Sequence, residues 1–222
     1  PDRDRFVLSK GHCAPGLYAT LAERGYFSTE ELKLLRHIGA MLQGHPDMKG
    51  TPGVDMSSGS LGQGVSAAVG MALAGKLDNK DYRVYTLLGD GEIEEGQVWE
   101  AAMFAAHKKL DNLCLIVDSN GLQIDGPVSE VAGPEPIDKK LEAFGFDVQT
   151  INGHCFDELE AAFAHARTVE GKPSVIITKT TKGKGVSYME NQVSWHGTAP
   201  NKEQYDVAMQ ELTAALQELE GC

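Results

Sequence analysis

Apolar runs of strand length alternate with helical patterns along most of this chain, and that alternation limits the possible folds more than any other feature. Three runs predict buried strands, at residues 84–88, 113–117 and 175–178, and a weaker fourth covers residues 147–151. Helical spacing occupies residues 65–77, 97–109 and 156–169, and further helices are expected at residues 28–37 and 205–219. Strands joined through helices predict an α/β fold, a mostly parallel sheet with helices on both faces. Because the sequence contains no internal repeat and no linker, residues 1–222 are expected to form a single domain.

The charge balance narrows the class of partner. With 20 Lys and Arg against 32 Asp and Glu, the net charge of -12 argues against nucleic acid and against an anionic membrane surface. An anionic ligand would need a metal ion, helix N-termini or a local basic pocket. No apolar stretch approaches the roughly 20 residues of a membrane span. The cysteines show no C-x-x-C pair and no metal-ligand spacing, which is typical of a reducing cytoplasm; they are Cys13, Cys114, Cys155 and Cys222.

The most informative motif lies where two predicted strands end. Gly89-Asp90-Gly91 follows the first strand, and Asp118-Ser119-Asn120-Gly121-Leu122 follows the second, with Asn120 placed 30 positions after Asp90. The carboxyl ends of neighbouring parallel strands meet at one edge of a sheet, where ligands bind. Mg²⁺ prefers oxygen ligands, so the Asp90 carboxylate, the Asn120 amide oxygen and the Leu122 carbonyl are predicted metal ligands. Gly91 allows a phosphate to approach the backbone, and the helix N-terminus that follows favours negative charge.

Ordered motifs along the chain indicate the family. The sequence contains, in this order, DRFVLSKGH, QGHP, SSGSLGQGVSAAVGMA, LLGDGEIEEGQVWEAA, VDSNGLQIDG and SWHG. Their order and spacing resemble the N-terminal part of transketolase from Asp4 to about Gly197, which is nearly the whole chain. The resemblance implies the thiamine diphosphate (ThDP)-binding fold of the family's diphosphate (PP) domain. It also implies ThDP and Mg²⁺, or Ca²⁺ or Mn²⁺ in its place, as cofactors.

The resemblance gives each matched residue a role. Asp90, Asn120 and Leu122 resemble the metal ligands, and Asp90, Gly91 and Asn120 resemble residues near the diphosphate. The other implied cofactor-binding residues are Gly59, Ser60, Leu61, Lys182, His12 and His196. The implied catalytic residues are His12, His45, His196, Glu95 and Glu100.

Two of these assignments have a purely structural alternative. Glu95 matches a glutamate that links cofactor sites across a subunit interface, and Glu100 matches the same buried acidic network. In the structural alternative, Glu92, Glu94 and Glu95 only complement a helix dipole, but the interface role is preferred for Glu95. Lys182 matches a lysine directed at the diphosphate, although a solvated basic loop would contain similar residues. The remaining histidines are expected to face solvent or to pack, with His37 and His107 on helices; they are His37, His107, His154 and His165.

The resemblance also implies that a second polypeptide is needed. In the family, the glutamate that activates the cofactor lies on a pyrimidine-binding domain that has no counterpart here. A further active-site histidine precedes DRF, and this sequence starts without Met, so we expect a preceding segment. The chain is either the N-terminal subunit of a split bacterial-type transketolase or a fragment of a longer enzyme; a terminal helix with no strand after it favours the split form. The expected partner is a C-terminal transketolase subunit, in a heterotetramer. The pair would transfer a two-carbon ketol unit from a ketose phosphate to an aldose phosphate in the pentose phosphate pathway.

Three alternative functions share the same predicted half-site. The first is another ThDP enzyme, such as 1-deoxyxylulose-5-phosphate synthase or a 2-oxo acid dehydrogenase E1; His12, His45 and the SWHG motif argue against it. The second is a split transketolase specialised for a branched or sulfonated sugar. The third is a non-catalytic ThDP-binding subunit, which the intact set of matched residues argues against.

Overall fold

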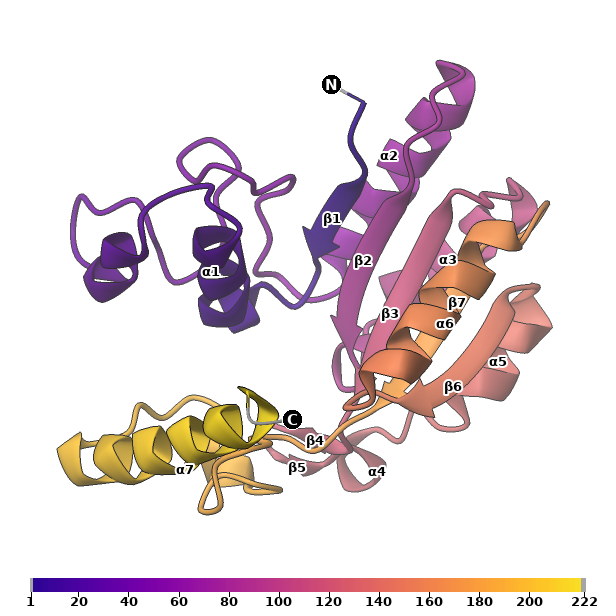
Figure 1. Ribbon diagram of the computed structural model, residues 1–222. Helices are drawn as coiled ribbons and strands as arrows, with labels where there is room; N and C mark the ends of the chain where they lie inside the picture. The colour runs from indigo at the N-terminus through magenta and orange to yellow at the C-terminus, as the bar shows by residue number, and fades with distance from the viewer. Residues whose placement is uncertain (1, 221–222) are drawn as a thin grey trace.

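Five parallel strands form the central sheet of the computed structural model, which describes residues 2–220, with only the backbone of Glu220 (Figure 1). The strands are β1 (Arg5–Leu8), β2 (Val84–Gly89), β3 (Leu113–Ser119), β6 (Asp147–Asn152) and β7 (Ser174–Lys179). Their order across the sheet is β1-β2-β3-β7-β6, and every neighbouring pair is parallel. The expected α/β fold is confirmed, and all four predicted strands are present. The additional strand β1 was missed because its four residues, RFVL, are too short to show a pattern.

The strand order explains which helices cover which face. The connections β1 to β2, β2 to β3 and β3 to β6 all advance across the sheet in one direction, whereas β6 to β7 turns back. Because crossover connections between parallel strands are right-handed, the first three place their helices on one face and the last on the other. These helices are α2 (Gln63–Leu77), α3 (Gly96–His107) and α5 (Ile137–Phe144) on the first face and α6 (Phe156–Thr168) on the second. Helices therefore lie on both faces, as predicted, but unequally.

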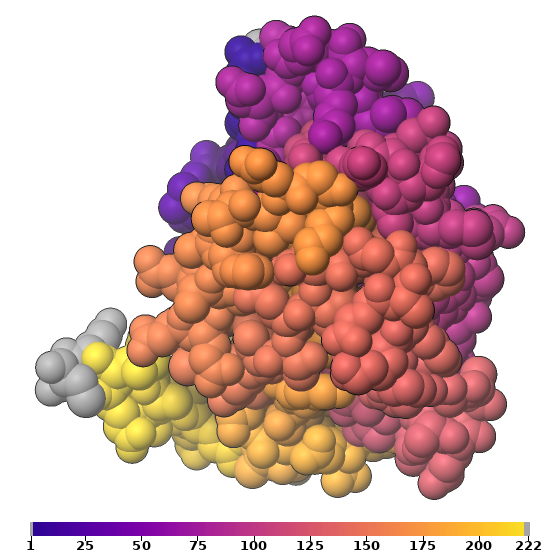
Figure 2. Space-filling model, turned by 90° about the vertical axis from the view of Figure 1, so that its right-hand side faces the viewer, coloured from indigo at the N-terminus to yellow at the C-terminus, as the bar shows by residue number. Residues whose placement is uncertain are grey.

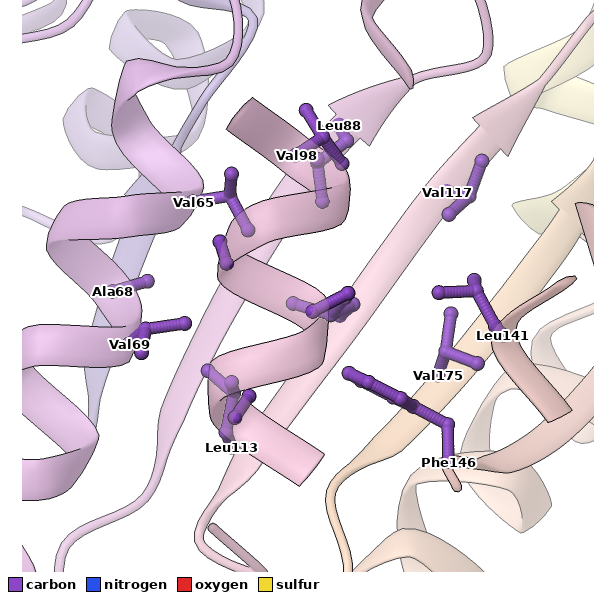
Figure 3. Close-up of a cluster of buried hydrophobic side chains, with 14 of the residues drawn as sticks. Val65, Ala68, Val69, Leu88, Val98, Leu113, Val117, Leu141, Phe146 and Val175 are labelled. Atoms are coloured by element: carbon purple, nitrogen blue, oxygen red, sulfur yellow. The ribbon is translucent and has the colours of Figure 1, made fainter. Parts of the chain in front are cut away.

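The main core lies between the sheet and the three helices of the first face (Figure 3). Val65, Ala68 and Val69 of α2, Val98 of α3 and Leu88 of β2 belong to this cluster. The small residues of α2 allow close contact with the sheet, and burying each larger aliphatic side chain contributes about 1.5–3 kcal/mol. The second face has a smaller core beneath α6, formed by Cys114, Ala162, Ala166 and Ile176. Burial raises the pKa of the Cys114 thiol to about 12, because an apolar core disfavours the thiolate. Cys222 lies outside the described residues.

The segment between β1 and α2 forms a lobe at the β1 edge, containing η1 (Gly11–Cys13), α1 (Ala14–Glu23) and η2 (Thr29–Leu34) (Figure 1). Ser28 caps the helix that follows it, since its hydroxyl accepts a hydrogen bond from the N–H of Glu30 at 3.2 Å. The helix that starts there is a short 3₁₀ helix that ends at Leu34, because Leu35 has a non-helical ψ of 126°, and the left-handed φ of 64° at Arg36 then turns the chain away. The expectation that residues 28–37 form one helix containing His37 is therefore wrong.

The remaining elements lie beyond the carboxyl ends of the strands. They are η3 (Glu92–Glu94), β4 (Leu122–Gln123), β5 (Gly126–Pro127), α4 (Val128–Val131), η4 (Val193–Trp195) and α7 (Lys202–Glu220). Figure 2 shows the side formed by α5 and α6, with the C-terminal segment in yellow at its lower edge. Helix α7 packs on the loop after β7, since Glu211 accepts hydrogen bonds from the N–H and hydroxyl of Ser187. None of the helices described is long and apolar enough to cross a bilayer.

Candidate cofactor site

The loops at the carboxyl ends of the strands surround a cavity of about 530 Å³. Segments that follow β1, β2, β3, β6 and β7 all contribute to its wall. This volume lies in the range of small-molecule sites, and the position agrees with the rule for parallel sheets. The cavity brings together most of the residues predicted from the sequence: His12, Leu61, Asp90, Gly91, Asn120, Leu122, Lys182 and His196.

Asp90 is held in place by the backbone of both strand ends. Its side chain is buried, with 3% of the residue exposed. The N–H of Gly121 donates to Asp90 Oδ2 at 2.6 Å, and the N–H of Gly91 donates to Oδ1 at 2.9 Å. Burial raises the pKa of Asp90 above its ordinary value, although the two N–H groups oppose that shift. The protein thus fixes a buried carboxylate whose negative charge is incompletely compensated.

Asn120 is the second predicted metal ligand, and it follows the neighbouring strand β3. Its Oδ1 accepts a hydrogen bond from the N–H of Leu122 at 3.0 Å, which orients the amide group. Gly89 of β2 is the register partner of Asp118 in β3, and the segments that follow them carry Asp90 and Asn120. The sequence prediction that these two strand ends meet is confirmed.

These donors suit a hard divalent cation bound together with a diphosphate. Within residues 2–220 there is no cluster of three or more His, Cys, Asp or Glu side chains placed to hold a metal ion. The predicted set has one carboxylate, one amide oxygen and one backbone carbonyl, and Mg²⁺ bound by such a set takes its remaining oxygens from phosphate or water. A Cβ added to Gly91 would lie 2.9 Å from Gln123 Oε1, so this wall of the cavity leaves no room for a side chain. The residues present therefore fit Mg²⁺ and a diphosphate.

A largely buried ion pair also lines the cavity. Lys10, only 8% exposed, forms a salt bridge with Asp118 Oδ2. Burial alone would lower the pKa of Lys10, but the Asp118 charge outweighs it and the pKa is raised. The pKa of Asp118 is likewise lowered against the effect of burial by Lys10 and by hydrogen bonds from Thr180 and Asn120. Asp118 thus connects the ends of β1, β3 and β7.

Three basic side chains form a second cluster in the cavity wall. The rings of His12 and His196 stack with centroids 5.2 Å apart, and Lys182 Nζ lies 3.2 Å from His196 Nδ1. The pKa of His12 is lowered to about 4. Burial is the largest cause, and nearby basic groups add to it: His196, Lys10, Lys182 and His45. Desolvation and the two lysines also lower the pKa of His196. Both rings are consequently neutral at pH 7, and Lys182 is a hydrogen-bond donor to His196.

His45 lies in an adjoining depression rather than in the main cavity. It lines that depression with Gly59 and Ser60. A Cβ on Gly59 would lie 2.8 Å from the His45 ring, and one on Gly11 would lie 2.7 Å from the Gly59 nitrogen. The two glycines thus permit the close packing that brings His45 beside the segment carrying His12. The predicted group of three histidines converges, with His45 at its margin.

Besides Asp90, this region contains a second buried acid, Glu92, which sequence reasoning missed. Its carboxylate accepts hydrogen bonds from Ser9 Oγ at 2.5 Å, from the N–H of Gly62 at 2.8 Å and from the N–H of Gly89 at 3.1 Å. Burial raises the pKa of Glu92, which these donors oppose. Glu92 therefore fastens the start of α2 to the ends of β1 and β2. No feature of the run Glu92-Ile93-Glu94-Glu95 distinguishes buried Glu92 from half-buried Glu94 and exposed Glu95.

Two predicted catalytic residues, Glu95 and Glu100, lie outside the cavity. Glu95 and Glu100 are exposed and line neither the main cavity nor the His45 depression. Their role at a subunit interface stays a prediction. His154 is exposed, as expected, but it also lines the main cavity together with Lys10 and Asp118. A signal was present for Asp118 and His154, because each lies just after a predicted strand, but not for Lys10, because the strand before it was not predicted.

Comparison with known proteins identifies the family. Residues 1–217 match the family described as transketolase, thiamine diphosphate binding domain. The chain belongs to this family. The cavity and its oxygen donors therefore lie in a ThDP-binding domain.

Relatives include both separate subunits and full-length enzymes. The chain is 50% identical to the 6-deoxy-6-sulfo-D-fructose transketolase subunit SqwG of Clostridium sp. (strain MSTE9), covering 96% of this chain and 77% of that protein. It is 45% identical to a subunit of the apulose-4-phosphate transketolase of Phocaeicola vulgatus, over 98% of this chain and 77% of the relative. Human transketolase is 46% identical over 98% of this chain, which spans only 34% of that enzyme.

Solved structures support the same assignment. The Campylobacter jejuni transketolase superposes with a TM-score of 0.90 at 39% identity, covering 95% of this chain and 34% of that one. The fold is therefore that of a transketolase, and the chain spans about a third of the full-length enzymes.

Proposed function

We propose that this chain binds Mg²⁺ and ThDP at the carboxyl edge of its sheet and acts as the N-terminal part of a transketolase. The observation that carries the proposal is the convergence of two groups on one cavity. Asp90, Asn120 and Leu122 provide oxygen donors on one side, and His12, His196 and Lys182 provide basic side chains on the other. The first group suits a metal-bound diphosphate, and the second suits a polar, anionic sugar.

Each group of residues has a definite task in this proposal. Asp90, Asn120 and the Leu122 carbonyl would hold Mg²⁺, and the Lys182 ammonium would bind diphosphate oxygens that approach the backbone at Gly91. Bound ThDP supplies the electron sink for breaking and forming a carbon–carbon bond. His12 is neutral at pH 7 because its pKa is about 4, so it can accept a proton from a sugar hydroxyl or donate a hydrogen bond to a sugar oxygen. The cation of Lys182 beside His196 favours negative charge developing on that oxygen.

The proposal includes a second polypeptide. Relatives of similar extent are named as transketolase subunits, and the chain spans only about a third of full-length transketolases. The remaining part of the active site, including the pyrimidine-binding domain, would come from a C-terminal subunit, in a heterotetramer placed in the cytoplasm. Exposed Glu95 and Glu100 would then lie at the interface between subunits. The general reaction would be ketol transfer between sugar phosphates, as in the pentose phosphate pathway.

A second candidate is a transketolase for an unusual sugar. Two of the relatives are named for a sulfonated deoxyfructose and for apulose 4-phosphate, at 50% and 45% identity. The 46% identity to human transketolase falls between these two values, so identity alone does not separate the two functions. Both candidates use the same cofactor site and differ only in the sugar.

Reconstitution with a pyrimidine-domain subunit tests the proposal. We expect the co-expressed pair to transfer a ketol unit from a ketose phosphate to an aldose phosphate, only with ThDP and Mg²⁺. Replacing the donor by a sulfonated or branched ketose separates the two candidates. Turnover of pyruvate without ketol transfer would instead point to the other ThDP enzymes, and binding of ThDP without any turnover would point to a non-catalytic subunit.

A further inference from the structure

His154 follows strand β6 and has a contact that its expected role as a solvent-facing residue does not explain. Its Nε2 accepts a hydrogen bond from the backbone N–H of Thr181 at 2.7 Å. Thr181 directly precedes Lys182, and both lie in the wall of the main cavity with His154. This contact joins the loop after β6 to the loop after β7, at the point where the second loop enters the site.

The two loops are built to meet at this place. A Cβ on Gly153 would lie 2.6 Å from Thr180 Cγ2, and the N–H of Gly153 donates to the Lys179 carbonyl at 2.9 Å. The N–H of His154 donates to Asn152 Oδ1 at 3.0 Å, which fixes the backbone that carries the ring. The imidazole therefore comes from a rigid turn at the end of a strand.

The loop that receives this hydrogen bond carries the basic cluster. Beyond Thr181, the Lys182 carbonyl accepts from the N–H of Asn191 at 2.9 Å, and Lys182 Nζ lies 3.2 Å from His196 Nδ1. The N–H of Thr181, through its hydrogen bond to His154, connects the backbone immediately before Lys182 to the loop after β6. Displacing it would move the Lys182 ammonium relative to Asp90 and Asn120.

We infer that His154 is a positioning residue that holds the Thr181–Lys182 backbone so that the Lys182 ammonium faces the bound diphosphate. The inference deepens the proposed function, since it assumes that the cavity binds ThDP. The chemistry requires an unprotonated Nε2, so the ring proton resides on Nδ1. His154 acts through Lys182 and touches neither the metal nor the reacting atoms.

The first experiment measures amide hydrogen exchange of residues 180–186 in the full chain without cofactor. His154→Leu removes the acceptor, His154→Gln places an amide oxygen near the position of Nε2, and His37→Leu alters an exposed histidine remote from the cavity. We expect exchange in His154→Leu to be about three- to tenfold faster, the effect of losing one hydrogen bond of ordinary net strength. His154→Gln and His37→Leu should exchange like the unchanged chain. Equal exchange in His154→Leu and the unchanged chain overturns the inference, as does equally fast exchange in His154→Gln.

The second experiment titrates ThDP into the chain assembled with its partner subunit. His154→Leu should require about three- to tenfold more ThDP for half-maximal activity, with little change in kcat at saturating ThDP. A merely structural role predicts a loss of folded enzyme that ThDP does not restore. If exchange behaves as expected but the unchanged chain binds no ThDP, the proposed function fails while the His154–Thr181 contact stands. If ThDP binds normally to every variant, the positioning role alone is wrong.

Should His154→Leu fail to fold, the ring itself remains testable in the unchanged chain. Nitrogen NMR distinguishes a protonated from an unprotonated ring nitrogen. We expect His154 Nε2 to be unprotonated and Nδ1 to be protonated at pH 7.5. A protonated Nε2 would exclude the contact with Thr181 and overturn the inference.

Discussion

The buried pair of Lys10 and Asp118 offers the sharpest test of how the site is assembled. Lys10→Met removes the cation and leaves the Asp118 carboxylate with its hydrogen bonds from Thr180 and Asn120. The side chains are 10% and 25% exposed, so the attraction acts in a medium far less polar than water. Breaking a fully buried pair on one side costs about 3–5 kcal/mol. Because Asp118 is partly exposed and keeps two donors, we expect a loss of about 2–3 kcal/mol in the free energy of unfolding at pH 7.

The pH dependence of this loss follows from the two pKa shifts. The lowered pKa of Asp118 means that its contribution is complete above about pH 4, the ordinary aspartate value, and is lost as pH falls through the folded-state pKa. The raised pKa of Lys10 means that its contribution is complete below about pH 10 and is lost as pH rises through the folded-state value. Lys10→Met should therefore cost most between about pH 5 and 9 and less at acidic pH, where its unpaired Asp118 takes up a proton.

Urea denaturation followed by circular dichroism measures these free energies. The matched control is Lys80→Met, because Lys80 forms an ion pair with Asp2 in which the side chains are 52% and 75% exposed. That variant should change stability by less than about 1 kcal/mol. In the double variant Lys10→Met/Asp118→Asn, the combined loss should be smaller than the sum of the single losses. The reasoning is refuted if Lys10→Met costs no more than Lys80→Met at pH 7.

Two further predictions concern groups whose pKa values are shifted. Glu92→Gln places an amide NH₂ against at least one of three hydrogen-bond donors, so thermal unfolding should show a loss of about 1–3 kcal/mol in the free energy of unfolding. Glu160→Gln, at an exposed position, should leave it unchanged. Equal melting temperatures for the two variants would contradict the Glu92 network. NMR titration of the His12 ring should give a midpoint near pH 4, and because the ordinary value is higher, the His12 contribution to stability should decline as pH falls from about 6.5 to 4. A His12 midpoint near pH 6.5 would show that the clustered charges do not act on the ring.

Much of the fold was predictable because its signals are local. Buried parallel strands such as β2, β3 and β7 are continuous apolar runs, and their spacing leaves room for helices, so the sequence predicted the α/β class and the edge at which ligands bind. The strand order was not predictable, because placing β6 at the outer edge beside β7 depends on how helices α5 and α6 pack. Strand β1 is too short to be detected, and the backbone conformation of Leu35, which ends a predicted helix early, is not revealed by composition.

The residues of the site also divide into those that the sequence predicted and those that it did not. Asp90, Asn120 and His196 lie in recognisable motifs, and the structure brings them to one cavity. Glu92 and Lys10 were missed because burial, which makes them important, depends on chain segments distant in sequence: Glu92 contacts Ser9, and Lys10 pairs with Asp118. His154 was missed because a histidine in a turn has no distinctive pattern, although its place at the end of a strand indicated the edge of the sheet where the cavity lies.

The central claim, that Asp90 at the carboxyl edge of β2 holds Mg²⁺ and ThDP, is tested most directly by calorimetric titration of ThDP in the presence of Mg²⁺. The titration compares the unchanged chain, Asp90→Ala and the exposed control Asp157→Ala, each in complex with the partner subunit. The account predicts saturable, Mg²⁺-dependent binding in the unchanged complex and in Asp157→Ala, with binding lost in Asp90→Ala while the complex stays folded. Normal ThDP affinity in a folded Asp90→Ala complex would contradict the assignment of the site.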